Sequence, residues 1–201
     1  MDKVVSKTKY DRKEHKKFYM FHLFHRSGTL YFMIVLLVLL GIMTVTDLMD
    51  KEKNGTFTMI MFGLTLGIIP FMIISRINEV VRQETPERIK SSDMIEVTKH
   101  KLIRVNDTIK GKGVIGWNNL DCVCETDEFF YLYTTDKSGL FIKKADIIEG
   151  SVELFRKLAL ANMPVDKKGK VKYKRYGNVK KVYKAEQKEI KRQKKLAKGS
   201  K

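Results

Sequence analysis

Two stretches of the chain run for twenty residues without a charged side chain: SGTLYFMIVLLVLLGIMTVT at 27–46 and TFTMIMFGLTLGIIPFMIIS at 56–75. A helix of about twenty residues is about 30 Å long, which is the hydrocarbon thickness of a bilayer. Leu, Ile, Val and Phe dominate both stretches, and each favours membrane insertion. Buried core helices of a soluble protein rarely stay apolar on every side for this length. The pattern therefore predicts two transmembrane helices.

The hydrophilic segments around these stretches predict how the helices lie in a membrane. Only nine residues, 47–55, join them, so the helices would form a tight hairpin with both outer ends on one side. Residues 1–26 carry eight Lys and Arg, whereas the loop carries two and residues 76–95 carry four. Because basic segments stay on the cytoplasmic side, we expect a multi-pass plasma-membrane protein with an outside loop and cytoplasmic termini. A connector, residues 76–90, would follow the second span.

Residues 1–26 form the predicted cytoplasmic leader. It opens with VVSKT, a short strand pattern, and Asp11 with Glu14 then marks the start of a helix that includes KKFYMFHLFH. The aromatic residues of that helix suit the membrane interface, so an interfacial helix is expected. His22 and His25 share one helix face, but a zinc site would need further ligands, so histidines without a metal are favoured.

Beyond residue 90 the pattern changes to short strands separated by turns rich in Gly, Asp, Asn and Ser. A helix, VELFRKLALANM, follows them, with Gly150 or Ser151 as its cap and Pro164 as its stop. Its apolar face needs a sheet to cover. We expect residues 91–163 to be a cytoplasmic α+β module, a curved antiparallel sheet closed by one C-terminal helix. The predicted strands are MIEVT, KLIRV, GVIGW, LDCVCE, FFYLYT and GLFIKK.

Charge is concentrated at the end of the chain. Of the formal net charge of +17, residues 165–201 contribute +13, from sixteen basic and three acidic groups. Lysines four residues apart repel one another on a helix, so residues 164–201 are predicted to be a mostly disordered or marginally helical basic tail. Three possibilities stay open: no dedicated partner, the anionic phospholipid of the inner leaflet, or RNA or the ribosome. The candidate contacts are Lys167, Lys168, Lys170, Lys172, Lys174, Arg175, Lys180, Lys181, Lys184, Lys188, Lys191, Arg192, Lys194 and Lys195.

The segment WNNLDCVCETDEFFYLY at 117–133 has the composition of a reactive site. Cys122 and Cys124 lie two apart, so on a strand they point to the same face, but the chain has no other cysteine to complete a zinc set. Free cysteines are most often buried as small hydrophobes, and Trp117 most often buries its ring. The acids of ETDE, including Glu125, are expected to be solvated in a turn. We therefore interpret the segment as a hairpin, with no catalytic, metal or cofactor site.

The second apolar stretch contains Gly63 and Gly67 one helical turn apart, followed by Pro70. Small residues at this spacing let two helix backbones approach closely. The favoured interpretation is helix packing against the first span within the hairpin, and a homodimer is the alternative.

The strand-rich part resembles a known family. W-x-x-L at Trp117 and Leu120, the hairpin at 125–133, F-I-K-K-A at 141–145 and E-x-x-x-x-x-F-R-x-L at 149–158 are similar to the YcxB-like proteins of bacteria. This resemblance implies a small pleckstrin-homology-like (PH-like) sheet or barrel at the cytoplasmic face of a bacterial plasma membrane. It supplies no catalytic residues, and the basic tail departs from the family's pattern.

These observations favour a membrane-anchored binding or scaffolding protein whose basic tail contacts anionic lipid. A membrane-tethered RNA or ribosome contact is the alternative. An enzyme is not expected, because no nucleophile–base pair, glycine-rich phosphate loop or metal set is visible. The protein partner of the module stays open.

Overall fold

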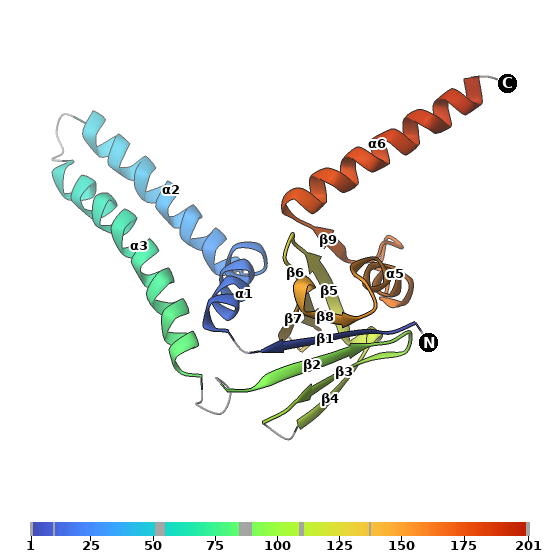
Figure 1. The fold of residues 1–201 in the computed structure, drawn as a ribbon. Coiled ribbons are helices and arrows are strands. Elements are labelled where there is room, and N and C mark those ends of the chain that lie inside the picture. The colour runs from blue at the N-terminus through green and yellow to red at the C-terminus, as the bar shows by residue number, and fades with distance from the viewer. Residues whose placement is uncertain are drawn as a thin grey trace. The chain divides into compact units, whose positions relative to one another are not determined.

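The structure is a computed structural model that describes residues 2–9, 11–50, 55–84, 90–108, 111–136 and 138–199, with residues 190–199 described by their backbone alone. Residues 51–54 of the expected outside loop and 85–89 of the expected connector lie outside the described residues. The chain divides into two compact units (Figure 1). Residues 11–89 form the helical unit, and residues 1–10 with 90–201 form the sheet unit.

The helical unit consists of α1 (Arg12–His25), α2 (Gly28–Met49) and α3 (Thr56–Arg82). α1 begins where the sequence predicts, because the Asp11 carboxylate accepts a hydrogen bond from the backbone N–H of Lys13 at 2.7 Å. At the start of α2, Ser27 Oγ accepts one from the N–H of Thr29 at 3.1 Å. Both helices thus start at a side chain that satisfies a backbone donor.

α2 and α3 contain the two apolar stretches, and both are long and apolar enough to span a membrane. Almost none of their apolar side chains is buried, unlike those in the core helices of a soluble protein. The two helices contact each other at Gly41, where an added Cβ would lie 3.4 Å from the Phe62 ring. Thr44 Oγ1 also donates a hydrogen bond to the carbonyl of Thr58 at 3.2 Å. The predicted pair of helices packed as neighbours is present.

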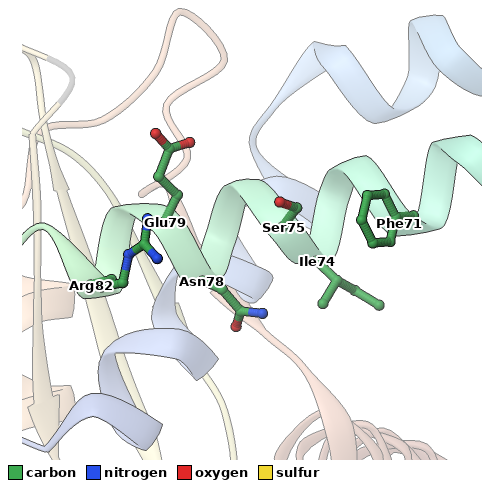
Figure 2. A pocket seen from close by; sticks show the side chains of 6 residues that line it. All are labelled: Phe71, Ile74, Ser75, Asn78, Glu79 and Arg82. Carbon is green, nitrogen blue, oxygen red and sulfur yellow. The ribbon is translucent and has the colours of Figure 1, made fainter.

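α3 continues beyond the apolar stretch, which ends at residue 75. Figure 2 shows Phe71 and Ile74 in its apolar part and Glu79 and Arg82 farther along the same helix. Arg76 Nη1 lies 3.2 Å from Glu79 Oε2, an i,i+3 ion pair of the kind that supports a helix surface. The first part of the expected connector is therefore helical.

The sheet unit contains two sheets (Figure 1). One has the strand order β4-β3-β2-β1-β8, and the other has the order β7-β6-β5-β9. Neighbouring strands are antiparallel except β5 and β9, which are parallel. The strands are β1 (Val4–Lys9), β2 (Ser92–Val97), β3 (Lys101–Asn106), β4 (Gly111–Gly116), β5 (Leu120–Glu125), β6 (Phe129–Thr134), β7 (Gly139–Lys143), β8 (Ile147–Glu149) and β9 (Tyr173–Arg175).

The six predicted strands correspond to β2 through β7, and the predicted helix is α5 (Val152–Asn162). Ser151 caps α5, because its Oγ accepts a hydrogen bond from the N–H of Leu154 at 3.1 Å. Phe155 of α5 packs on Phe130 of β6 with ring centroids 4.2 Å apart, and both side chains are fully buried. The expected single curved sheet is instead two sheets, and the described strands do not close into a barrel.

The N-terminal strand is the largest difference from the expected domain layout. β1 lies between β2 and β8, and it pairs with β2 from Val4 opposite Val97 to Lys9 opposite Ser92. The leader is therefore not a separate segment, since its first residues complete the sheet unit. This pairing joins residues separated by the whole helical unit, so no local pattern indicates it.

The basic tail is also divided. Val165 and Val171 form an isolated antiparallel bridge, β9 adds to the edge of β5, and the helix α6 (Gly177–Gly199) follows. The prediction of a mostly disordered or marginally helical tail considered only local propensity. The backbone hydrogen bonds with β5 and the anchoring of α6 described below supply tertiary contacts that such an estimate omits.

Candidate functional site

The cysteine-containing segment is core, as the sequence indicates. Cys122 and Cys124 are buried free thiols with their Sγ atoms 3.9 Å apart. The Cys122 thiol and burial both raise the pKa of the Cys124 thiol, so it stays protonated. Trp117 is buried and its Nε1–H donates to the carbonyl of Thr98 at 3.0 Å. Among the described residues, no group of three or more His, Cys, Asp and Glu could hold a metal ion.

The expectation that the acids of ETDE are solvated is wrong for Glu125. This residue is fully buried at the end of β5. Its Oε1 lies 2.8 Å from Lys144 Nζ and 2.6 Å from Arg156 Nη2. Its Oε2 accepts a hydrogen bond from the hydroxyl of Tyr173 at 2.9 Å and lies 3.6 Å from Arg175 Nε. We refer to these five residues as the Glu125 cluster.

The interactions within the cluster keep Glu125 and Arg156 ionised. Burial opposes the charge of Glu125, but the hydrogen bonds from Arg156 and Lys144 outweigh it, so the pKa of Glu125 is lower than usual. The hydrogen bond to Glu125 raises the pKa of Arg156. Burial raises the pKa of Tyr173, helped by the adjacent Glu125 charge. Glu125 is thus a carboxylate, and Tyr173 is a neutral phenol that donates to it.

The cluster joins four elements of the sheet unit. Glu125 belongs to β5, Lys144 to the 3₁₀ turn η2 (Lys144–Asp146), Arg156 to α5, and Tyr173 and Arg175 to β9. Both carboxylate oxygens of Glu125 are used for pairing, and its side chain is fully buried. The cluster therefore acts as a structural junction that fixes β9, and with it the chain that leads into α6.

The first turn of α6 is fixed in the same way. The carboxylate of Asp127 accepts hydrogen bonds from the N–H groups of Asn178 and Val179 at 3.3 and 3.0 Å. Gly177 has φ +61°, and an added Cβ would lie 2.8 Å from Asp127 Oδ2, so this position requires glycine. The guanidinium of Arg175 lies 3.9 Å from the centre of the Tyr183 ring, in cation–π contact. α6 thus begins as an anchored helix.

α6 has two different faces. Val179, Val182, Tyr183 and Glu186 line a cleft of about 610 Å³ that Arg156 and Leu160 of α5 also line. Helical spacing of 3.6 residues per turn places the lysines on the opposite side of α6. The exposed lysines of that side, which we name the lysine face, are Lys180, Lys181, Lys184 and Lys188.

Apart from the lysine face and Arg175, the candidate basic contacts fall into three groups. Lys167, Lys168 and Lys170 are exposed in a turn where Asp166 Oδ1 accepts from the N–H groups of Lys168 and Lys170 at 2.8 and 2.9 Å. Lys174 is exposed on β9, whereas Lys172 pairs with Asp121 at 2.7 Å. Lys191, Arg192, Lys194 and Lys195 continue α6, with side chains outside the described part.

Arg175 is the candidate contact that the structure places differently. Its side chain is only 14% exposed, because it pairs with Glu125 and stacks on Tyr173 and Tyr183. It is an internal cation rather than a surface one.

The glycine pair of α3 does not pack as favoured. At Gly63 and Gly67 an added Cβ would meet nothing within 4 Å, and both residues are exposed. The contact with α2 is made instead at Phe62 and Thr58, on a different face of α3. Packing of these glycines against the first span is therefore wrong for this structure.

Comparison with known proteins gives a match for the sheet unit. The sequence profile of the YcxB-like protein family matches residues 102–159, from β3 to α5. No curated protein and no solved structure matches the chain. The matched range includes Glu125, Lys144 and Arg156, while Tyr173, Arg175 and α6 lie beyond it. Residues 102–159 are therefore similar to the YcxB-like protein family, the family that the motifs of residues 117–158 indicate.

Proposed function

We propose that this is a membrane-anchored binding or scaffolding protein of the bacterial plasma membrane, whose lysine face binds anionic phospholipid. α2 and α3 would cross the bilayer, and the sheet unit would be a PH-like module in the cytoplasm. The observation that carries the proposal is the anchored α6, which presents Lys180, Lys181, Lys184 and Lys188 away from the cleft with α5.

The exposed apolar surfaces of α2 and α3 support the membrane anchor. Large side chains such as Phe32, Leu39 and Phe57 are 68%, 55% and 70% exposed. In water such continuous apolar surface is unfavourable, and in a bilayer it is the ordinary condition of a spanning helix. Lipid is therefore a more favourable environment than water for these two helices.

The pairing of β1 with β2 supports the sidedness. The chain leaves the sheet after Lys9 and returns to it at Ser92, which is the partner of Lys9. Both ends of the helical unit therefore connect to one sheet, so the N-terminus and the sheet unit must be on the same side of any membrane that α2 and α3 cross. The basic residues of the leader and the connector favour the cytoplasmic side.

Lipid is favoured over RNA as the partner of the lysine face. A helix tethered beside a membrane experiences a high effective concentration of lipid headgroups. Lysine outnumbers arginine, with 31 against 9 in the chain, and lysine acts as a point charge rather than a bidentate fork. Loose electrostatic attraction to a charged surface fits this composition better than sequence-specific reading of RNA.

The topology gives a direct test of the proposal. Reporter proteins fused to either terminus are expected to be active only in the cytoplasm, and a reporter inserted after Asp50 only outside. Lys195→Cys should resist a membrane-impermeant thiol reagent in intact cells, while Asp50→Cys serves as the labelled control. Labelling of position 195 from outside would contradict the proposed layout.

A further inference from the structure

A groove of about 300 Å³ lies between α1, α2 and α3 of the helical unit. Its walls are mainly apolar and include Leu23 of α1, Met33 of α2, and Met72 and Ile73 of α3. The volume is at the small end of the range for ligand pockets, about 300–1,000 Å³. It suits part of one extended apolar chain rather than a whole lipid.

Polar groups line the groove around Arg76, and Ile77 and Val80 of α3 continue its apolar lining beyond that residue. Arg76 and His22 line the groove, together with Ser27 at the start of α2, and no carboxylate is among the described residues that line it. The Arg76 side chain is 75% exposed and pairs with Glu79 through Nη1. A guanidinium has five N–H donors in a planar fork, so this pair leaves donors for a phosphate. Burial, with the charge of Arg26, lowers the pKa of His22, so its ring is uncharged at neutral pH.

The order of these groups along α3 matches the order of the layers in a membrane. Arg76 is the first residue after the apolar stretch 56–75, where the hydrocarbon would end. Met72 lies one helical turn before it, about 6 Å deeper at 1.5 Å per residue. The part of the groove at Arg76 would thus be at the depth of lipid phosphates, and its part at Met72 among the acyl chains.

We propose that the groove holds one anionic phospholipid from the leaflet next to the sheet unit, with its phosphate at Arg76 and one acyl chain along Met33, Met72 and Ile73. Arg76 is the one formally charged side chain that lines the groove among the described residues, and the donors that its pair with Glu79 leaves favour the phosphate of an anionic lipid. The inference rests on the proposed membrane anchor, but it concerns a site separate from the lysine face.

The test uses the full-length chain in nanodiscs that contain equal amounts of phosphatidylglycerol and phosphatidylethanolamine. Native mass spectrometry counts the lipids that stay bound after release. We expect one retained phosphatidylglycerol on the unaltered chain, and about a tenfold loss of that retention in Arg76→Ala, the size expected for one charge-assisted hydrogen bond. Arg82→Ala is the matched control, since Arg82 carries the same charge on α3 but does not line this groove.

Two more variants define the site. Met72→Trp should fill the part of the groove at Met72 and reduce retention of any lipid. Exchanging Lys180, Lys181, Lys184 and Lys188 for glutamine should leave the retained lipid unchanged, because the lysine face is not part of the groove. Equal retention in Arg76→Ala and Arg82→Ala would overturn the proposal. Equal retention of both lipids by the unaltered chain would overturn it as well. A dimer of the chain that retains no lipid would also overturn it, because a second copy would then occupy the groove.

Alkaline extraction of membranes distinguishes failure of the proposed membrane anchor from failure of the proposed lipid groove. If the unaltered chain is extracted as a soluble protein, the proposed membrane anchor fails and the groove loses its lipid with it. If the chain stays in the membrane but shows no preference at Arg76, the groove proposal alone fails.

Discussion

Glu125→Ala is expected to lower the free energy of unfolding of the sheet unit by about 3–5 kcal/mol, the usual cost of removing one partner from a buried ion pair. The substitution leaves Lys144, Arg156 and Arg175 facing one another without their shared carboxylate. It also leaves the partly buried hydroxyl of Tyr173 without its acceptor. Like charges and an unsatisfied donor both act against the folded state.

Unfolding of the full-length chain can be followed in detergent through Trp117. It is the chain's one tryptophan, and it is buried in the core of the sheet unit, so its fluorescence reports on that unit. Glu153→Ala is the matched control, because Glu153 also pairs with Arg156, at 3.3 Å, but is 75% exposed. Its loss should cost at most about 1 kcal/mol. Equal effects of the two substitutions would show that the cluster does not fix the fold.

The same carboxylate gives a pH dependence. The pKa of Glu125 is lower in the folded chain than its usual value of about 4.3. A lowered folded pKa means that the stabilisation is complete above the usual pKa and is lost as pH falls through the folded pKa. Below about pH 4 the free energy of unfolding should therefore fall more steeply with decreasing pH for the unaltered chain than for Glu125→Gln, which cannot titrate at this position. If the difference in free energy of unfolding between the two proteins stays constant down to pH 2, Glu125 is not the titrating group.

The part of the fold that the sequence predicts is the part with local patterns. β2 through β7 are runs of five or six residues bounded by turn residues, and α5 has both a cap at Ser151 and an apolar face. β8 and β9 have three residues each, which is too short for alternation to be read. β1 has a pattern, but its place between β2 and β8 depends on partners far away in the chain. Long-range pairing, rather than propensity, decides these strands.

Glu125 shows why the candidate site could not be predicted fully. Locally it begins ETDE, a polar turn, and its partners lie 19, 31 and 50 positions later at Lys144, Arg156 and Arg175. The available signal was the neighbouring strand: FFYLYT is almost entirely apolar on both faces, which is typical of a strand covered on both sides. A charged residue at the end of the strand that pairs with it needs a buried counter-ion, and this reasoning points to Glu125 rather than to the cysteines.

The basic helix is expected to bind anionic vesicles through its lysine face. A peptide of residues 177–199 carries nine basic and two acidic groups, so alone in dilute buffer it should be mostly unfolded. Vesicles rich in phosphatidylglycerol should induce helix, measurable by circular dichroism. If about four to six lysines engage, at about 1 kcal/mol each, the attraction is about 4–6 kcal/mol, which corresponds to millimolar to tens-of-micromolar affinity.

The matched variant peptide replaces Lys180, Lys181, Lys184 and Lys188 by glutamine, which keeps length and helix propensity. Its binding should be weaker by about a thousandfold, since about 4 kcal/mol of attraction is lost. Replacing Val182 and Tyr183 by serine should change vesicle binding far less. In the protein these two side chains line the cleft beside α5, and Tyr183 is held by Arg175.

Salt distinguishes this binding from hydrophobic insertion. Raising ionic strength from about 0.1 M to 1 M shortens the Debye length from about 10 Å to 3 Å, which screens exposed lysines from the headgroups. Binding of the unaltered peptide should then disappear, while an inserted apolar face would remain bound. Equal binding to neutral vesicles, or binding that survives 1 M salt, would show that the lysine face is not the contact. Neutralisation of phosphates would drive binding to either RNA or anionic lipid. Tight binding to RNA without binding to anionic vesicles would therefore favour the RNA or ribosome contact.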